Sequence, residues 1–148
     1  MKLNLGSSDR HFTGYLNVDI VPPADLIMDL TKEWKSGDSS VEEIRAWDII
    51  EHLPDKIHTM NEAWRVLIPN GIFDIIVPTT DGRGAWQDPQ HCSYWNINSF
   101  FYYVKGVAEY ERFHVAYGIE ACFRVITKRL ESIADEVVKL HITLAAVK

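Results

Sequence analysis

The hydrophobic positions at the start of the chain come in short runs that polar turn residues separate. Lys2–Leu5 and Tyr15–Ile20 are predicted strands, "PPADLIMDL" contains a brief third one, and "VEEIRAWDII" is a fourth that ends near Asp48. Further along, "IFDIIVP" is almost continuously apolar, as is typical of a central parallel strand that is covered on both faces. These runs predict a sheet that begins at the amino end of the chain.

A different spacing begins after Asp55, where apolar residues recur every three or four positions. The residues that follow this spacing are Ile57, Met60, Ala63, Trp64 and Leu67. The pattern predicts an amphipathic helix with one buried stripe. The Asn70-Gly71 pair is a turn signal that ends it before the strand in "IFDIIVP".

The last part of the chain begins with a long polar and aromatic stretch over residues 79–99, and long connections of this kind are often functional. "NSFFYYVKGV" is predicted to form a short helix capped by Asn98 or Ser99. Two strand-like segments, 122–133 and 137–147, can pair as a hairpin. This order predicts one α/β domain over residues 1–148, with a Rossmann-like, doubly wound, mostly parallel sheet and an antiparallel carboxyl-terminal edge hairpin.

Composition narrows the class of protein. A net charge of −6 argues against an extended nucleic-acid surface, because phosphate contacts need clustered Lys and Arg. We find neither a long apolar run nor a basic-then-apolar leader, so no membrane span or targeting segment is expected. Cys92 and Cys122 are too few for a disulfide framework and are expected to be free thiols in a cytoplasmic protein.

The stretch "LNLGSSDRHFTGYLNVDI" looks like a nucleotide-binding βαβ unit that is too short to contain its crossover helix. An acid at the end of the second strand, Asp19, can accept hydrogen bonds from the two hydroxyls of a ribose. The turn reads Gly6-Ser7-Ser8-Asp9, so it offers no glycine-rich cradle for a pyrophosphate and places an acid there. S-adenosylmethionine has no phosphate, and the turn therefore favours it over NAD.

Five motifs in order strengthen this interpretation: "LNLGSSD", "NVDI", "MDLT", "EHL" and "RVLIPNGIFDIIVP". Together they resemble class I S-adenosylmethionine-dependent methyltransferases, in a compact branch with a reduced first crossover helix. The resemblance implies that Gly6 and Ser7 approach the methionine part and that Asp19 binds the ribose. It also implies that the cofactor-binding residues are Gly6, Ser7, Ser8, Asp19, Ile20, Asp29, Leu30, Trp47 and Asp48. Asp29 and Leu30 would meet the adenine, and Trp47 and Asp48 the sulfonium side.

Candidate catalytic residues lie in "WDIIEHL" and "DPQHCSYW", and they are His91, His52 and Glu51. Asp48, Glu51 and His52 are spaced so that one helical turn brings them to one face. With His91 they are a sensible set for a divalent metal, similar to the pattern of small-RNA 2′-O-methyltransferases and some ubiquinone-pathway O-methyltransferases. Two other interpretations stay open: His91 as a general base, or a capping and anchoring role for all of them.

The predicted function is methyl transfer from S-adenosylmethionine to a small-molecule or saccharide-like acceptor. Trp86 and Trp95 are expected at the mouth of the acceptor pocket, with Trp86 beside mobile glycines in "DGRG". The alternative for this loop is that the aromatic rings only cover the open end of the sheet. The alternative function is that of a non-catalytic Rossmann-like subunit that binds a partner protein. The exposed aromatic loop also makes a homodimer plausible.

Overall fold

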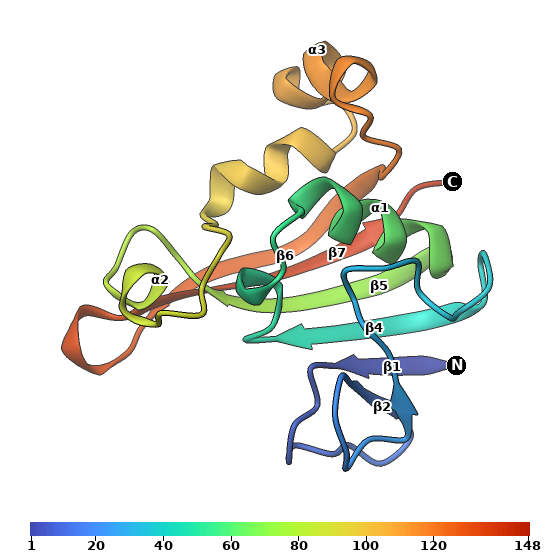
Figure 1. The fold of residues 1–148 in the computed structure, drawn as a ribbon. Helices are drawn as coiled ribbons and strands as arrows, with labels where there is room; N and C mark the ends of the chain where they lie inside the picture. The colour runs from blue at the N-terminus through green and yellow to red at the C-terminus, as the bar shows by residue number, and fades with distance from the viewer.

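The computed structural model describes residues 1–148 and contains one seven-stranded sheet (Figure 1). The strands are β1 Lys2–Leu5, β2 Leu16–Asp19, β3 Leu26–Ile27, β4 Val41–Trp47, β5 Leu67–Pro78, β6 Phe123–Ser132 and β7 Val138–Ala146. They lie in the order β3-β2-β1-β4-β5-β7-β6. The first five are parallel, and β7 is antiparallel to both β5 and β6. The predicted Rossmann-like α/β fold with an antiparallel edge pair is confirmed.

Strand order reverses between β1 and β4, which lie side by side although β2 and β3 separate them in sequence. In open α/β sheets, ligands bind outside the carboxyl ends of the strands at such a point. The turns that follow β1, β2, β3 and β4 are therefore the place to look for a site.

Six helical segments connect the strands: η1 Ile50–His52, α1 Lys56–Val66, α2 Gly84–Gln87, η2 Ile97–Tyr103, α3 Ala108–Tyr117 and η3 Ala134–Glu136. Helix α1 begins where its apolar spacing predicts, and the Asp55 side chain caps it by accepting a hydrogen bond from the His58 amide. The predicted cap of η2 is wrong by two or three residues. Asn96 caps that helix, because its side chain accepts hydrogen bonds from the amides of Asn98 and Ser99.

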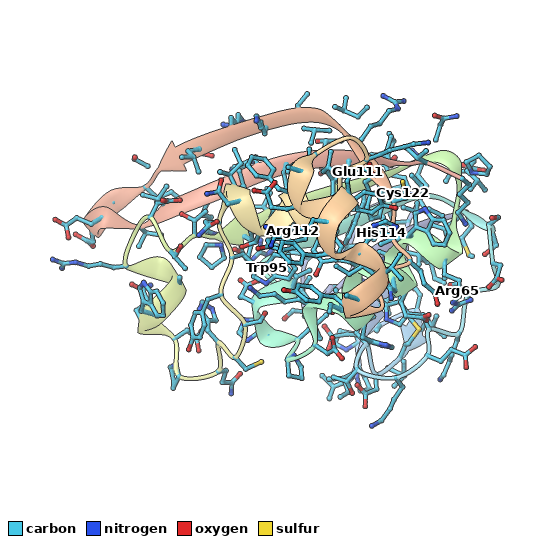
Figure 2. The ribbon with its side chains drawn as sticks, turned by 90° about the horizontal axis from the view of Figure 1, so that it is seen from above. Arg65, Trp95, Glu111, Arg112, His114 and Cys122 are labelled. Carbon is cyan, nitrogen blue, oxygen red and sulfur yellow. The ribbon has the colours of Figure 1, made fainter.

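Helix α3 has no counterpart in the sequence predictions. None of its residues is buried, and it projects from the body of the molecule beside η2 (Figure 1). Seen from above, it carries Glu111, Arg112 and His114 across the front of the sheet (Figure 2). No helix in the chain has the length and apolar character needed to cross a membrane. Cys92 and Cys122 are unpaired, as predicted.

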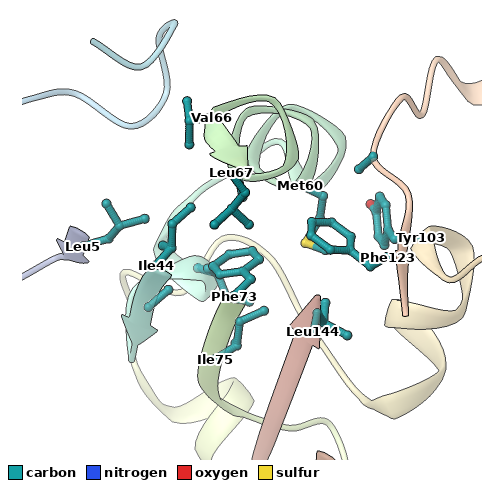
Figure 3. Packing of buried hydrophobic residues seen from close by; sticks show 14 of the residues in the cluster. Leu5, Ile44, Met60, Val66, Leu67, Phe73, Ile75, Tyr103, Phe123 and Leu144 are labelled. Atoms are coloured by element: carbon teal, nitrogen blue, oxygen red, sulfur yellow. The ribbon is translucent and has the colours of Figure 1, made fainter. Parts of the chain in front are cut away.

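The core lies on one face of the sheet, under α1 and η2. Met60 and Leu67 pack down onto Phe73 and its neighbours on β4 and β7 (Figure 3). Along β5, Phe73, Ile75 and Val77 are buried, while Ile72, Asp74 and Ile76 on the other face are only half-buried. The expectation that this strand is covered on both faces is therefore wrong, because no long helix packs on the second face.

A small cluster covers part of that second face. The connection from β1 to β2 contains no helix and instead lays Phe12 and Tyr15 against β4. The Arg45 guanidinium lies 4.4 Å from the ring centroid of Phe12, 4.7 Å from that of Tyr15 and 4.4 Å from that of Trp47. These stacked contacts occupy the place of the missing crossover helix.

Candidate functional site

A cavity of about 200 Å3 opens at the carboxyl ends of β1, β2 and β3. It brings together five of the residues predicted to bind the cofactor, namely Gly6, Asp19, Ile20, Asp29 and Leu30. The remaining lining residues are Met28, Thr31, Ile49, His52 and Leu53. Parallel strand pairing explains the gathering, because Leu5 is in register with Val18, and Val18 with Leu26, so that their following turns meet.

Asp19 is fixed by the backbone around it. One carboxylate oxygen accepts a hydrogen bond from the Ser8 amide at 2.9 Å, and the other accepts one from the Ile20 amide at 2.7 Å. The Val21 amide also donates to the second oxygen, at 3.4 Å. A carboxylate has about four acceptor sites, so these three bonds leave room for at least one hydroxyl donor. The side chain is held at the cavity edge in a geometry suited to a ribose.

Asp29 is fixed in a similar way on the other side of the cavity. One oxygen accepts hydrogen bonds from both the amide and the hydroxyl of Thr31, and these bonds lower the pKa of Asp29. Sequence reasoning did not single out Thr31, although the "MDLT" motif contains it. The turn therefore presents a rigid wall to the cavity.

Gly6 is required by packing as well as by conformation. Its φ of +61° lies in the left-handed region, and a Cβ built there would lie 2.6–2.8 Å from side-chain atoms of Ile49. Only glycine allows the residue that follows β4 to close over the turn that follows β1. Sequence reasoning missed Ile49, because nothing local marks it as a partner of Gly6.

Four of the predicted cofactor residues do not line this cavity. Ser7 is buried beside it and its hydroxyl has no partner, whereas Ser8 is exposed and contributes its amide to Asp19. Trp47 lies on the second face of the sheet, where its indole donates to Asp74. The prediction that Trp47 lies beside the sulfonium needs correction. Its side chain projects from the opposite face of β4, so the ring points away from the cavity.

Asp48, the fourth of these, points toward a second cavity of about 210 Å3. Both of its carboxylate oxygens accept hydrogen bonds from Lys139 at 2.7 Å. Lys139 comes from β7 and reaches this position because it is paired with Pro78 at the end of β5. No local sequence signal connects Lys139 with Asp48, so sequence reasoning missed this pair.

The second cavity contains the three candidate catalytic residues. It is lined by Asp48, Glu51, His52, Pro78, Gly84, Gln87, Asp88, His91, Val137 and Lys139. Ligand atoms of Glu51, His52 and His91 all lie within 4.8 Å of one another. The His52 and His91 rings meet edge to face with their centroids 4.8 Å apart. Because His52 also lines the first cavity, its side chain stands between the two.

Electrostatics at this centre are unusual. Glu51 is 2% exposed, and one of its carboxylate oxygens has no hydrogen-bond partner. Burial raises the pKa of Glu51 to about 7, and the negative charge of Asp48 adds to the shift. Perturbed carboxyl groups in cavities are typical of functional sites.

The aromatic loop is divided between the surface and the core. Trp86 is 59% exposed and stacks on Tyr94, with ring centroids 4.5 Å apart. Trp95 is fully buried against Phe100, so its predicted place at the mouth of the acceptor pocket is wrong. In "DGRG", Gly82 packs closely against the β6–β7 hairpin, because a Cβ built on it would lie 2.6 Å from backbone atoms there.

Two larger cavities of about 580 Å3 each contain none of the predicted catalytic or cofactor residues. One is lined by Thr80, Asp81, Gly82, Arg83, Trp86, Glu136 and Val138, next to the segment that carries His91. The other lies between α1, η2 and the end of α3. Size alone therefore does not identify the site, whereas the chemistry of the lining residues does.

No known family model matches the sequence, and neither does any curated protein. Solved structures match it across nearly the whole chain. A SAM-dependent methyltransferase from Methanosarcina mazei superposes with a TM-score of 0.66 at 11% identity, over 99% of this chain and 92% of that one. The 1,6-didemethyltoxoflavin-N1-methyltransferase of Burkholderia thailandensis, solved with S-adenosylhomocysteine, gives 0.66 at 14% identity, over 99% and 71%.

The cyclase SpnF also matches, with a TM-score of 0.66 at 10% identity, over 99% of this chain and 74% of that one. These likenesses establish the fold of the class I S-adenosylmethionine-dependent methyltransferases and confirm the resemblance at that level. Because a cyclase shares this fold, the reaction has to be argued from the site.

Proposed function

We propose that the protein is an S-adenosylmethionine-dependent methyltransferase that acts on a small, hydroxyl-bearing acceptor such as a saccharide. The observation that carries this proposal is the pair of adjoining cavities, one with Asp19 and Gly6 and the other with Glu51 and His91, which His52 separates. A methyl donor and an acceptor need such neighbouring sites, because the reaction depends mostly on their positioning.

The first cavity suits S-adenosylmethionine better than a dinucleotide. Asp19 would accept the ribose hydroxyls, Asp29 and Leu30 would contact the adenine, and the Gly6 turn would approach the methionine part. Two carboxylates at the edge repel a pyrophosphate, and the turn supplies no helix amino end to bind one. A cationic sulfonium is compatible with this charge.

The second cavity suits a polar acceptor, because most of its lining residues can form hydrogen bonds. In the proposed reaction an acceptor hydroxyl oxygen forms a bond to the methyl carbon. The carbon–sulfur bond breaks, and its electron pair stays on sulfur, which leaves as the neutral thioether of S-adenosylhomocysteine. The hydroxyl proton passes to a carboxylate of the cavity.

Isothermal titration with S-adenosylhomocysteine tests the cofactor assignment, with NAD as the comparison ligand. We expect micromolar binding of the former alone, and a loss of at least tenfold in Asp19→Ala, because the charge-assisted hydrogen bonding of the carboxylate to the ribose is removed. Asp9→Ala is the matched control, since Asp9 is exposed and lies outside the cavity.

If neither ligand binds the wild-type protein, a non-catalytic partner-binding subunit becomes the better proposal. Helix α3 supports that alternative, since it buries none of its residues and exposes 81% of Val115. In that case we expect the protein to form a stable complex with a partner through α3, and we expect the Val115→Glu variant not to form it.

A further inference from the structure

We propose that Glu51, His52 and His91 bind a divalent transition-metal ion on the acceptor side of the site. The role of this ion in catalysis rests on the proposed methyltransferase function, but its binding does not. Ligand atoms of these three side chains lie within 4.8 Å of one another. The side chains of Glu51 and His91 are almost fully buried, and all three groups converge on the same cavity.

Hydrogen bonding shows which atoms face the centre. His91 Nδ1 lies 3.0 Å from the Ala85 carbonyl oxygen, which can only accept, so Nδ1 carries the proton. In the neutral ring, Nε2 then presents a lone pair. That lone pair faces a carboxylate oxygen of Glu51 and one of Asp88, each 3.9 Å away.

Electron-rich atoms that converge in a buried place need a positive partner. A separation of 3.9 Å is too long for a hydrogen bond between them. It is close to the widest spacing of two ligands on opposite sides of one ion, since bonds from nitrogen and oxygen to zinc are each about 2.0–2.2 Å. The unpaired oxygen of Glu51 is a second and independent sign, because a buried carboxylate without a donor is costly.

The ligand set indicates the kind of ion. Two imidazoles and one carboxylate favour Mn²⁺, Fe²⁺, Co²⁺ or Zn²⁺ over Mg²⁺ and Ca²⁺, which prefer oxygen. Asp48 would have added a further oxygen ligand, but Lys139 holds both of its carboxylate oxygens. Asp88 stands at the rim and is available to accept a proton. A cation here would lower the pKa of an acceptor hydroxyl bound to it.

The test is titration of the chelator-stripped full chain with Mn²⁺, followed by electron paramagnetic resonance, and with Co²⁺, followed by its absorption spectrum. We expect one ion per chain and at least a tenfold loss of affinity in both Glu51→Gln and His91→Ala. Glu51→Gln keeps the size and shape of the side chain. Because one carboxylate oxygen of Glu51 makes no hydrogen bond in the wild type, we expect this variant to fold.

Two control variants show whether the ion binds at this centre or at another histidine. His58→Ala makes the same change at a histidine on α1 and should bind as the wild type does. His141→Ala removes a surface histidine that pairs with Glu131 at 2.7 Å, the other place where an ion could bind by chance. Absence of binding by the wild type, or binding retained in both centre variants, overturns the proposal.

Failure here can be told apart from failure of the methyltransferase assignment. Binding of S-adenosylhomocysteine is measured in the presence of chelator, and metal binding is measured in the absence of cofactor. Cofactor binding without metal binding leaves the first proposal standing and overturns the second. Metal binding without cofactor binding does the reverse.

Discussion

The two cavities are assembled in opposite ways. The cavity that contains Gly6 and Asp19, which we propose for the cofactor and call the cofactor cavity, is made mostly of turns that directly follow β1, β2 and β3, and backbone conformation decides its shape. The cavity that we propose for the acceptor, the acceptor cavity, combines the end of β4, the segment around His91 and Lys139 of β7, and side-chain pairs decide its shape. We therefore expect substitutions in the first to disturb folding and binding together, and substitutions in the second to affect turnover alone.

Gly6→Ala is expected to have the largest effect. The new Cβ would have to adopt a left-handed conformation and would clash with Ile49, which together cost about 2–5 kcal/mol. Thermal unfolding should show a large loss of stability, and titration should show no binding of S-adenosylhomocysteine.

A double variant sharpens this prediction. Ile49→Ala removes the clashing Cγ1 and Cδ1 atoms but keeps the Cβ atom at 2.8 Å, so Gly6→Ala/Ile49→Ala should recover only part of the binding and none of the conformational cost. Gly37→Ala is the control, because a Cβ there meets no atom within 4 Å. A Gly6→Ala protein that binds as the wild type does would show that the turn is not part of the site.

Lys139→Met should break the acceptor cavity while leaving the other intact. It releases Asp48 from two hydrogen bonds and leaves a half-buried carboxylate without its partner. We expect turnover to fall at least tenfold with the affinity for S-adenosylhomocysteine unchanged within twofold. Lys128→Met on the exposed edge strand is the matched control, and a lost cofactor affinity in Lys139→Met would contradict the division into two cavities.

Glu62→Gln tests how the cofactor wall is anchored. Glu62 accepts hydrogen bonds from the Trp34 amide and from Arg65, and so fixes the connection that follows Leu30 and Thr31. Burial alone would raise the pKa of Glu62, but the hydrogen bonds from Arg65 and Trp34 lower it below its ordinary value of 4.5. The variant should lose about 1–3 kcal/mol of unfolding free energy at pH 7.

The difference in unfolding free energy between the wild type and Glu62→Gln should also depend on pH. Because the folded state lowers the pKa, the stabilisation by Glu62 is present above pH 4.5 and is lost as the pH falls further and the carboxylate is protonated. Urea unfolding of both proteins between pH 7 and pH 3 would show the curves converge. The control is Glu42→Gln at an exposed position, which should show no such convergence. A stability difference between the wild type and Glu62→Gln that grows as the pH falls would refute the proposed role of Glu62.

Trp86→Ala is expected to have the smallest effect. The ring is largely exposed, so stability should change by less than about 0.5 kcal/mol. If the Trp86–Tyr94 stack contacts the acceptor, KM for the acceptor should rise a few fold while cofactor affinity stays constant. Steady-state kinetics measures both, and a changed cofactor affinity would argue against a place on the acceptor side.

Much of the fold could be predicted because its signals are local. Strand runs, the start of the helix after Asp55 and the spacing of Met60 and Ala63 each depend on a few neighbouring residues. Gly6, Asp19 and Asp29 could be predicted for the same reason, since each follows a strand and strand ends meet at one edge of the sheet.

The missed features depend on contacts between distant residues. Lys139 reaches Asp48 only because β7 lies next to β5 in one particular register, and Ile49 covers Gly6 only once β4 lies beside β1. Trp95 and Trp86 come from the same aromatic loop, yet tertiary packing buries one and exposes the other. Helix α3 was missed although Tyr110, Phe113 and Tyr117 recur at helical spacing, because this stripe is short and none of its residues is fully buried.

His52 belongs to the lining of both cavities, so the binding free energies of ligands in the two cavities depend on each other. The position that the His52 ring takes when one cavity is occupied determines how much space a ligand has in the other cavity. By linkage, the factor by which the first ligand changes the affinity of the second must equal the factor in the reverse direction. If the two cavities hold the methyl donor and the acceptor as proposed, the position of this one imidazole couples their two binding affinities.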